Sequence, residues 1–352
     1  MVAPVSILIP TFKRSQLIGY VLEALRKQTQ KDFEVIIVLK PSGDETEEVI
    51  QKYQKHLSLK VVPQTKGYFL DALNIGLDNA DGKIVAFLDD DAIPAADWIQ
   101  TYSDALAMPN VGGVAGNVIP ATLNKGKLLY SKEESSETIP KLRSHRSPVE
   151  SIGKTVWNKP LKSMEDYLIY LSKAGIVTKN NDIARNAKNK MTKSLLEMGA
   201  NMCVSSKALG NFRFPKSTIL GSGGEQLLGW HLWKQGYKLF YNPAAKVYHL
   251  AHGQTLSRNI SDTRRETLRS TEANLLFYRL YGSEPDLSIM HRISWLIFDS
   301  AIELKRVCIN REINRLAKNK SKFYSETIGT KWLLYRKLGV EYSPLADLQK
   351  LK

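Results

Sequence analysis

Short apolar runs alternate with segments of helical periodicity through the first quarter of this chain, and this alternation restricts its possible folds more than any other feature. The runs are rich in β-branched residues and cover residues 5–10, 33–39, 59–62 and 84–88. Continuous apolar runs of this length are typical of strands buried on both faces of a parallel sheet. Strands that alternate with helices predict an α/β fold with right-handed crossovers and a doubly wound sheet.

Helices are predicted between these strands, over residues 15–27, 45–56 and 71–79. In the first of them, Leu17, Val21 and Leu25 recur at four-residue spacing and form one apolar stripe. The second helix carries acidic residues in its first turn, where the helix dipole favours negative charge.

Three consecutive acidic residues, Asp89, Asp90 and Asp91, follow directly after the fourth apolar run. In open α/β sheets, ligands bind beyond the carboxyl ends of the strands, which places this cluster on one rim with residues 10–11 and 39–40. Carboxylates this close repel one another, and a cation relieves the repulsion. Oxygen ligands near a phosphate suit Mg²⁺ or Mn²⁺. The alternative is an acidic turn that caps the next helix.

The net charge of +15 is divided unevenly along the chain. Residues 1–120 carry 11 Lys and Arg against 15 Asp and Glu, a net of −4, whereas residues 121–352 carry 39 against 20, a net of +19. A basic surface attracts nucleic acid, anionic lipid or phosphorylated substrates, or is a solvated face without a partner. We expect no nucleic acid, because no recognised nucleic-acid motif accompanies these charges.

Cysteine content and hydropathy limit the cellular setting. Cys203 and Cys308 allow at most one disulfide, so the fold does not depend on a disulfide framework and a reducing interior is expected. The first ten residues lack a basic leader region, and no later run is long and apolar enough to span a bilayer. We therefore expect a cytoplasmic protein, with peripheral contact at the cytoplasmic membrane face as a further possibility.

Several segments, in this order, resemble the family 2 glycosyltransferases of the GT-A fold. The matching segments are SILIPTFKR at 6–14, KGYFLDALNIGLDNADGKIVAFLDDDAIP at 66–94, GANMCVSSKAL at 199–209 and GSGGEQLLGWHLWKQGYKLFYNPAAKVYH at 221–249. The resemblance implies a Rossmann-like, doubly wound mixed sheet and a metal-dependent, inverting transfer of a sugar. The donor would be a nucleotide-diphospho-sugar, and the acceptor a hydroxyl group of a glycan, glycolipid or lipid-linked molecule.

The resemblance also implies a division of the chain. Residues 1–253 form the catalytic domain, with a nucleotide-binding half at 1–120, an insertion or lid at 121–198 and an acceptor half at 199–253. The resemblance fades after residue 253, and helical periodicity predicts a helical C-terminal extension at 254–352. Within these regions we expect a strand over 112–119 and helices over 165–174, 184–198, 226–235, 264–281 and 289–316.

Candidate site residues are assigned by the resemblance, or by their place beside the matching segments. Asp89 and Asp91 take the outer positions of the DXD motif, and His249 matches a histidine that completes the metal site with Mn²⁺ or Mg²⁺. The residues expected to contact the donor are Pro10, Thr11, Lys40, Lys66, Gly67, Asn74, Asp89, Asp90 and Asp91. The residues expected to contact the acceptor are Trp98, Gly224, Gln226 and Trp230.

Two departures from the family pattern qualify these assignments. Relatives carry Glu-Asp where this chain has Glu225-Gln226, and Gln226 cannot accept a proton. Glu225 is the predicted general base, and the alternative role for this residue is helix capping. The alternative function for the whole chain is that of a catalytically silent homologue that binds nucleotide sugars. Leu39 and Lys40 replace the acidic residue that commonly pairs with uracil, so the nucleotide base stays open.

Overall fold

The structure is a computed structural model, and it describes residues 4–67, 69–124, 126–130, 160–171, 177–196, 199–214 and 224–250. The first half of these residues forms β1 (Val5–Thr11), α1 (Ile18–Arg26), β2 (Phe33–Leu39), α2 (Thr46–Gln51), β3 (Leu59–Pro63), α3 (Phe69–Asp78), β4 (Ile84–Leu88), β5 (Ala92–Pro94), α4 (Trp98–Leu106), β6 (Val111–Asn124) and β7 (Lys127–Tyr130). The second half forms a 3-10 turn η1 (Lys162–Met164), β8 (Ile169–Leu171), β9 (Val177–Lys179), α6 (Asn181–Asn186), β10 (Thr192–Lys193), β11 (Asn201–Ser205), α7 (Ser206–Leu209), α8 (Gly224–Lys234) and β12 (Lys238–Leu250).

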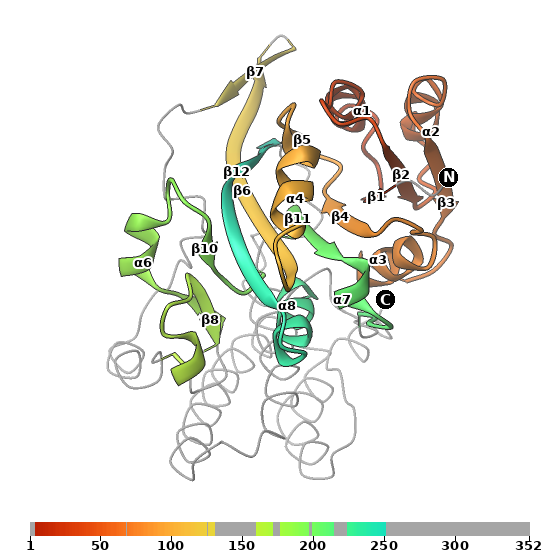
Figure 1. Cartoon of the computed structure of the whole chain (residues 1–352). Helices are drawn as coiled ribbons and strands as arrows, with labels where there is room; N and C mark the ends of the chain where they lie inside the picture. Colours follow the sequence, from red (N-terminus) through yellow and green to blue (C-terminus); the bar gives the residue numbers. More distant parts are fainter. Residues whose placement is uncertain are drawn as a thin grey trace, which may run out of the picture.

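One mixed sheet organises these elements, in the strand order β10-β12-β6-β11-β4-β1-β2-β3 (Figure 1). The four strands predicted from the apolar runs, β1 to β4, are parallel to one another where they pair. Strand β11 is antiparallel to both β4 and β6, and β12 returns parallel to β6. The α/β fold with a doubly wound mixed sheet is thereby confirmed.

Both faces of the sheet are buried, which explains the continuous apolar runs. Along β1, Ile7 and Ile9 pack with α1, α2 and α4 in one cluster of buried side chains, which we call the α1 core. Leu8 packs with α3, α7 and α8 in the other cluster, the α3 core. Because successive side chains of a strand point to opposite faces, each run must be apolar throughout to fill both cores.

The chain changes direction between β1 and β4. From β1 it proceeds through α1 to β2 and through α2 to β3, and α3 then carries it back to β4 on the other side of β1. This reversal is the topological switch point at which open α/β sheets bind ligands, beyond the carboxyl ends of the strands. Thr11 and Leu88 are the last residues of the two strands that meet there.

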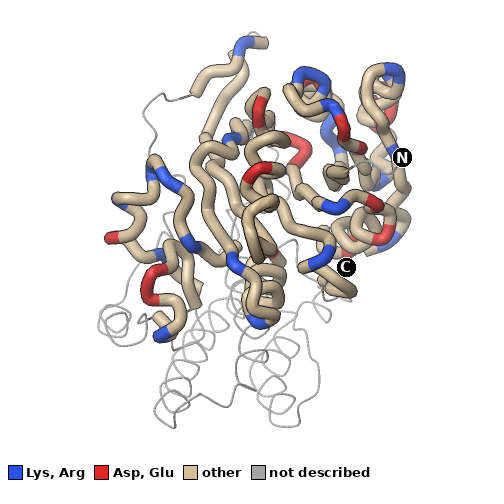
Figure 2. The backbone as a smooth tube through the Cα atoms, viewed as in Figure 1, with Lys and Arg blue, Asp and Glu red and all other residues tan. Residues whose placement is uncertain are grey.

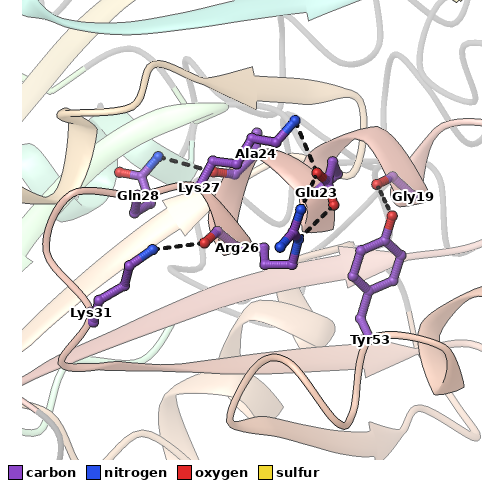
Figure 3. A network of polar contacts seen from close by, with 8 residues as sticks. All are labelled: Gly19, Glu23, Ala24, Arg26, Lys27, Gln28, Lys31 and Tyr53. Carbon is purple, nitrogen blue, oxygen red and sulfur yellow. Dashed lines mark hydrogen bonds and ion pairs between the residues drawn. The ribbon is translucent and has the colours of Figure 1, made fainter.

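Helix α1 is joined to its surroundings by polar contacts on its exposed side (Figure 3). Glu23 accepts from Arg26 at 2.8 Å and pairs with Lys27 at 2.9 Å, and these partners lower the pKa of Glu23 to about 2. The hydroxyl of Tyr53, which follows α2, donates to the carbonyl of Gly19 at 3.0 Å. Exposed ion pairs of this kind contribute little free energy, so the α1 core and not this network holds the helix in place.

The insertion differs from its prediction. A strand, β8, occupies part of the segment expected to be a helix at 165–174, and it pairs antiparallel with β9. The helix expected at 184–198 is replaced by the shorter α6, which Asn180 caps through the amides of Asp182 and Ile183, followed by strand β10. All three residues of β8 are buried, so its apolar residues lack the alternation that distinguishes a strand from a helix.

Of the three remaining predicted helices, one lies among the described residues and two do not. The helix expected over 226–235 is present as α8, with the bounds Gly224–Lys234. The helices expected over 264–281 and 289–316 lie outside the described residues.

Candidate metal and donor site

The acidic cluster follows β4 in a tight turn that β12 holds from the other side. The amide of Ala92 donates to the carbonyl of Asp89 at 3.2 Å, and β5 begins at Ala92. Strand β5 pairs antiparallel with β12, with Ala92 opposite His249. The amide of Leu250 donates to the carbonyl of Asp91 at 2.9 Å. These backbone contacts bring the end of β12 beside the cluster.

Asp89, Asp91 and His249 form a candidate metal site. One ligand atom from each of the three residues lies within 4.8 Å of the others. The Nε2 atom of His249 is 3.2 Å from Oδ1 of Asp91 and 3.8 Å from Oδ2 of Asp89. The side chain of Asp91 is 8% exposed, whereas those of His249 and Asp89 are 26% and 30% exposed. The candidate site is therefore partly accessible to solvent at Asp89 and His249 and is buried at Asp91.

The charge state of His249 supports a cation at this position. Burial lowers the pKa of the imidazole, but the carboxylates of Asp89 and Asp91 outweigh burial and raise the pKa of His249 to about 10. A positive charge is thus stabilised between the two carboxylates. A divalent cation ligated by two carboxylates and a neutral imidazole satisfies the same need, because carboxylate oxygens and imidazole nitrogens are its common protein ligands.

Asp90 points into the protein, where it meets Arg14. Arg14 Nε donates to Asp90 Oδ1 at 3.1 Å, and both side chains are buried. Burial and the charge of Asp91 raise the pKa of Asp90 to about 7, although Arg14 lowers it. The middle carboxylate therefore joins the loop after β1 to the loop after β4, and its Oδ1 faces Arg14. Sequence reasoning assigned Asp90 to the donor and missed Arg14, whose only signal was its place at the end of SILIPTFKR.

Arg14 also ties this rim to the loop after β2. Its main-chain amide donates to Thr46 Oγ1 at 2.9 Å, and the Thr46 hydroxyl donates to Asp44 at 2.9 Å. Pro10 and Thr11, which were assigned to the donor, end β1 on the same rim. The carboxyl ends of β1, β2 and β4 are thus connected through side chains as well as through the sheet.

Lys40 and Gly67, both assigned to the donor, lie together. Lys40 Nζ donates to the Gly67 carbonyl at 3.2 Å and lies 5.6 Å from the centre of the Phe12 ring. Gly67 has φ of 89°, and a Cβ atom there would come within 2.5 Å of Asp71 Oδ2, so only glycine fits this turn. Lys66 is exposed beside them.

Asn74 occupies a different environment from that expected of a donor ligand. Its Nδ2 donates to the Phe214 carbonyl at 2.8 Å, and its Oδ1 accepts from the Phe214 amide at 2.8 Å. These bonds fasten α3 to the segment that follows α7. The amide group of Asn74 therefore has a structural role in this conformation.

The residues assigned to the acceptor divide into buried and accessible ones. Trp98 is 0% exposed, and its indole donates to Asn201 at 2.7 Å, so the prediction that it contacts the acceptor is wrong. Trp230 is 4% exposed and stacks on Trp233 with ring centres 5.0 Å apart, which makes it part of the α3 core. Gln226 is partly exposed in the first turn of α8.

Gly224 and Glu225 begin α8. A Cβ atom at Gly224 would approach Leu70 Cδ2 to 2.6 Å, so α8 packs closely against α3 at this position. A Cβ atom at Gly199 would lie 3.8 Å from the carboxylate carbon of Glu225. The carboxylate therefore lies beside the start of the segment that leads into β11.

Comparison with known proteins agrees with this arrangement. Residues 6–163 match the model of the family described as glycosyl transferase family 2. Chondroitin synthase from Escherichia coli is 38% identical over 106 residues, which cover 29% of this chain and 16% of that protein. The GalNAc(5)-diNAcBac-PP-undecaprenol beta-1,3-glucosyltransferase of Campylobacter jejuni is 35% identical over 95 residues, covering 24% and 29% respectively.

A solved structure supports the same fold. The crystal structure of GalNAc-T7 with UDP, GalNAc and Mn²⁺ has a TM-score of 0.55 and 12% sequence identity, covering 85% of this chain and 54% of that one. Residues 6–163 of this chain therefore belong to the family 2 glycosyltransferases, and the fold of the chain is GT-A. The chain spans less than a third of the length of the two curated relatives described above.

The raised pKa of His249 predicts a specific dependence of stability on pH. Because the folded-state pKa lies above the ordinary value of 6.5, the stabilisation is fully present below 6.5 and is lost as the pH rises through about 10. In the presence of a chelator, wild type should therefore exceed His249→Gln in free energy of unfolding at low pH, and the difference should shrink across this range. Urea denaturation at several pH values measures it.

The control for this measurement is His56→Gln, which changes an exposed histidine away from the cluster. It should give no comparable difference. A His249→Gln difference that is constant with pH would show that the imidazole is neutral between the two carboxylates.

Proposed function

We propose that this chain is a glycosyltransferase that moves a sugar from a nucleotide-diphosphate donor to an acceptor hydroxyl, with Mn²⁺ or Mg²⁺ bound by Asp89, Asp91 and His249. The observation that carries the proposal is the cluster of three ligand atoms at the carboxyl end of β4, beside the switch point of a GT-A sheet. A bound cation would stabilise the negative charge that develops on the departing nucleotide diphosphate.

The residues around the cluster support donor binding, and each has a separate role. Arg14 neutralises Asp90, which leaves Asp89 and Asp91 directed to His249 and the cation. Lys40 and Lys66 place positive charge on the same rim, where it suits the phosphates of a donor. The nucleotide base is open, so UDP-, GDP- and dTDP-sugars are all candidates.

Glu225 is the proposed general base. Inversion at the sugar requires a group that accepts the proton of the attacking hydroxyl, and a carboxylate at the first turn of α8 meets this need. Gln226 next to it cannot do so. The silent-homologue alternative shares the donor site and differs only in lacking turnover, so release of nucleotide diphosphate from a panel of donor sugars with Mn²⁺ distinguishes the two.

Asp91→Asn tests the metal role. Because the substitution removes the least exposed charge of the cluster, Mn²⁺-dependent binding of the donor should be lost while the fold persists. Calorimetric titration with each nucleotide diphosphate and Mn²⁺ measures the binding. Asp81→Asn, an exposed position before the other end of β4, is the matched control and should bind normally. Normal binding by Asp91→Asn would show that the cluster is only an acidic turn.

Glu225→Gln tests the base. Donor affinity should stay close to that of wild type, and transfer should fall by about 100-fold to 10,000-fold, which is the usual scale of general-base catalysis. Glu48→Gln, which removes an acidic residue from the first turn of α2, controls for a helix-capping role. Equal activity of the two variants would assign the base to another carboxylate.

We further propose that the acceptor is a glycan, glycolipid or lipid-linked molecule and that the protein contacts anionic membrane peripherally. The charge of +19 after residue 120 supports this, and two described stretches of the insertion, 160–171 and 177–196, together carry 6 of these Lys and Arg residues against 3 Asp and Glu (Figure 2). The Campylobacter relative is named for an undecaprenol-linked acceptor. No helix among the described residues is long and apolar enough to cross a membrane.

Vesicle co-sedimentation of the full chain tests the membrane contact. Each basic residue near an anionic surface contributes about 1 kcal/mol of attraction, which salt screens over a Debye length of about 10 Å at 0.1 M. Pelleting should therefore occur with phosphatidylserine-containing vesicles at low salt and decrease at high salt. Equal, negligible pelleting with neutral and anionic vesicles would exclude the membrane contact and favour a soluble acceptor.

A further inference from the structure

We propose that Asn201 is a positioning residue for the metal site, because its side-chain amide clamps a bulge in β12 that turns His249 toward Asp91. The inference rests on the proposed metal site. It concerns how the chain brings its third ligand to the two carboxylates.

The ligands come from strands that do not touch. Asp89 and Asp91 follow β4, whereas His249 belongs to β12, and β11 and β6 lie between these two strands in the sheet (Figure 1). The direction in which the His249 side chain points is therefore set by the register of β12 against its partners β6 and β5, and not by its own neighbours in sequence. A register error of one residue would turn the imidazole to the other face of the sheet.

That register is interrupted by an insertion. Asn242 pairs with Gly116, and the next pair along the two strands is Lys246 with Asn117. Residues 243–245 lie between these pairs without a partner on β6. Three is an odd number, so the insertion exchanges the faces to which odd- and even-numbered residues of β12 point.

The exchange of faces is visible in which residues of β12 pack in each of the two cores. Before the insertion, Leu239 packs in the α3 core and Phe240 packs against the α1 core. At its last residue and after it, Ala245 and Val247 pack in the α1 core, although they are odd-numbered like Leu239. His249 continues the alternation of Val247. Without the insertion, the pairing would continue from Asn242 with Gly116, and Lys246 instead of His249 would lie opposite Pro120.

Asn201 holds both carbonyl groups at the insertion. Its Nδ2 donates to the Asn117 carbonyl at 2.9 Å and to the Ala245 carbonyl at 2.8 Å. Its Oδ1 accepts from Trp98 Nε1 at 2.7 Å and from the Tyr102 hydroxyl at 2.6 Å. Asn201 is 0% exposed, so every polar group that loses one of these bonds is left without water to replace it.

The same residue reaches the acidic cluster through the backbone. Asn201 pairs with Leu88, which immediately precedes Asp89. Gly116 leaves room for the clamp, since a Cβ atom there would lie 2.3 Å from both the Ala245 carbonyl oxygen and Asn201 Nδ2. Asn201 thus connects the strand that carries the carboxylates to the bulge that orients the imidazole.

The test compares two substitutions at the two ends of the Asn201 side chain. Asn201→Asp keeps the size and the accepting oxygen but removes the amide that donates to both carbonyls. Tyr102→Phe removes one bond on the accepting side and leaves the clamp intact. Both should lower thermal stability. Binding of Mn²⁺ alone to the folded full chain, followed by the electron paramagnetic resonance signal of free Mn²⁺, should weaken about 10- to 100-fold only in Asn201→Asp.

A second comparison shows whether the effect passes through His249. On a His249→Gln background, Asn201→Asp should cause no further loss of Mn²⁺ affinity, because the ligand that it orients is already gone. Asn201→Ser, which also removes the amide, replaces Asn201→Asp if the latter does not fold.

The outcomes separate this inference from the proposed function. If His249→Gln weakens Mn²⁺ binding but the Asn201 variants bind as tightly as Tyr102→Phe, Asn201 is only structural and the inference is wrong. If wild type itself binds no Mn²⁺, the proposed metal site fails and the inference fails with it.

Discussion

Repulsion among three consecutive carboxylates at the end of a buried strand is the constraint that organises the described rim of this protein. Charges this close destabilise one another, and the two inner side chains, Asp90 and Asp91, have little contact with water. Each of these two carboxylates has one basic side chain beside it. Arg14 reaches Asp90 from the loop after β1, and His249 reaches Asp91 from β12. The strands on both sides of the switch point are thereby held together by the same cluster.

The two partners differ in a way that matters for function. A guanidinium stays charged at all relevant pH values, so the positive charge of Arg14 beside Asp90 is permanent. An imidazole is able to give up its proton, so His249 can leave two carboxylates and a neutral nitrogen for a cation. A contact with a fixed positive charge, at Asp90, thus lies next to a contact with a partner that can lose its proton, at Asp91. This pairing supports metal binding at Asp89 and Asp91 without loss of the turn when the metal leaves.

The sequence was sufficient for the parts of the fold that depend on local pattern. The strands at 33–39 and 84–88 have the bounds expected from their apolar runs, because burial on both faces leaves no room for polar residues. The same property misled the prediction at 165–174, where buried residues of β8 lack a strand's alternation. Trp98 was assigned to the acceptor from its place shortly after the 66–94 segment, and only the fold shows that its ring is fully buried. Motif position predicts the backbone location of a residue better than it predicts the direction of its side chain.

The orientation of the His249 side chain was the feature of the site least predictable from the sequence. The motif match placed it in the metal site, but alternation along 245–249 gives no information about which face the imidazole occupies. That face is decided by three residues of β12 that have no partner on β6, and by an asparagine more than forty residues earlier in the chain. A bulge of this kind removes three backbone positions from the sheet ladder, and the bonds from Asn201 compensate part of that loss. The candidate metal site therefore depends on a contact between two strands that contain no acidic residue, and His249 is the only one of its three ligands that they carry.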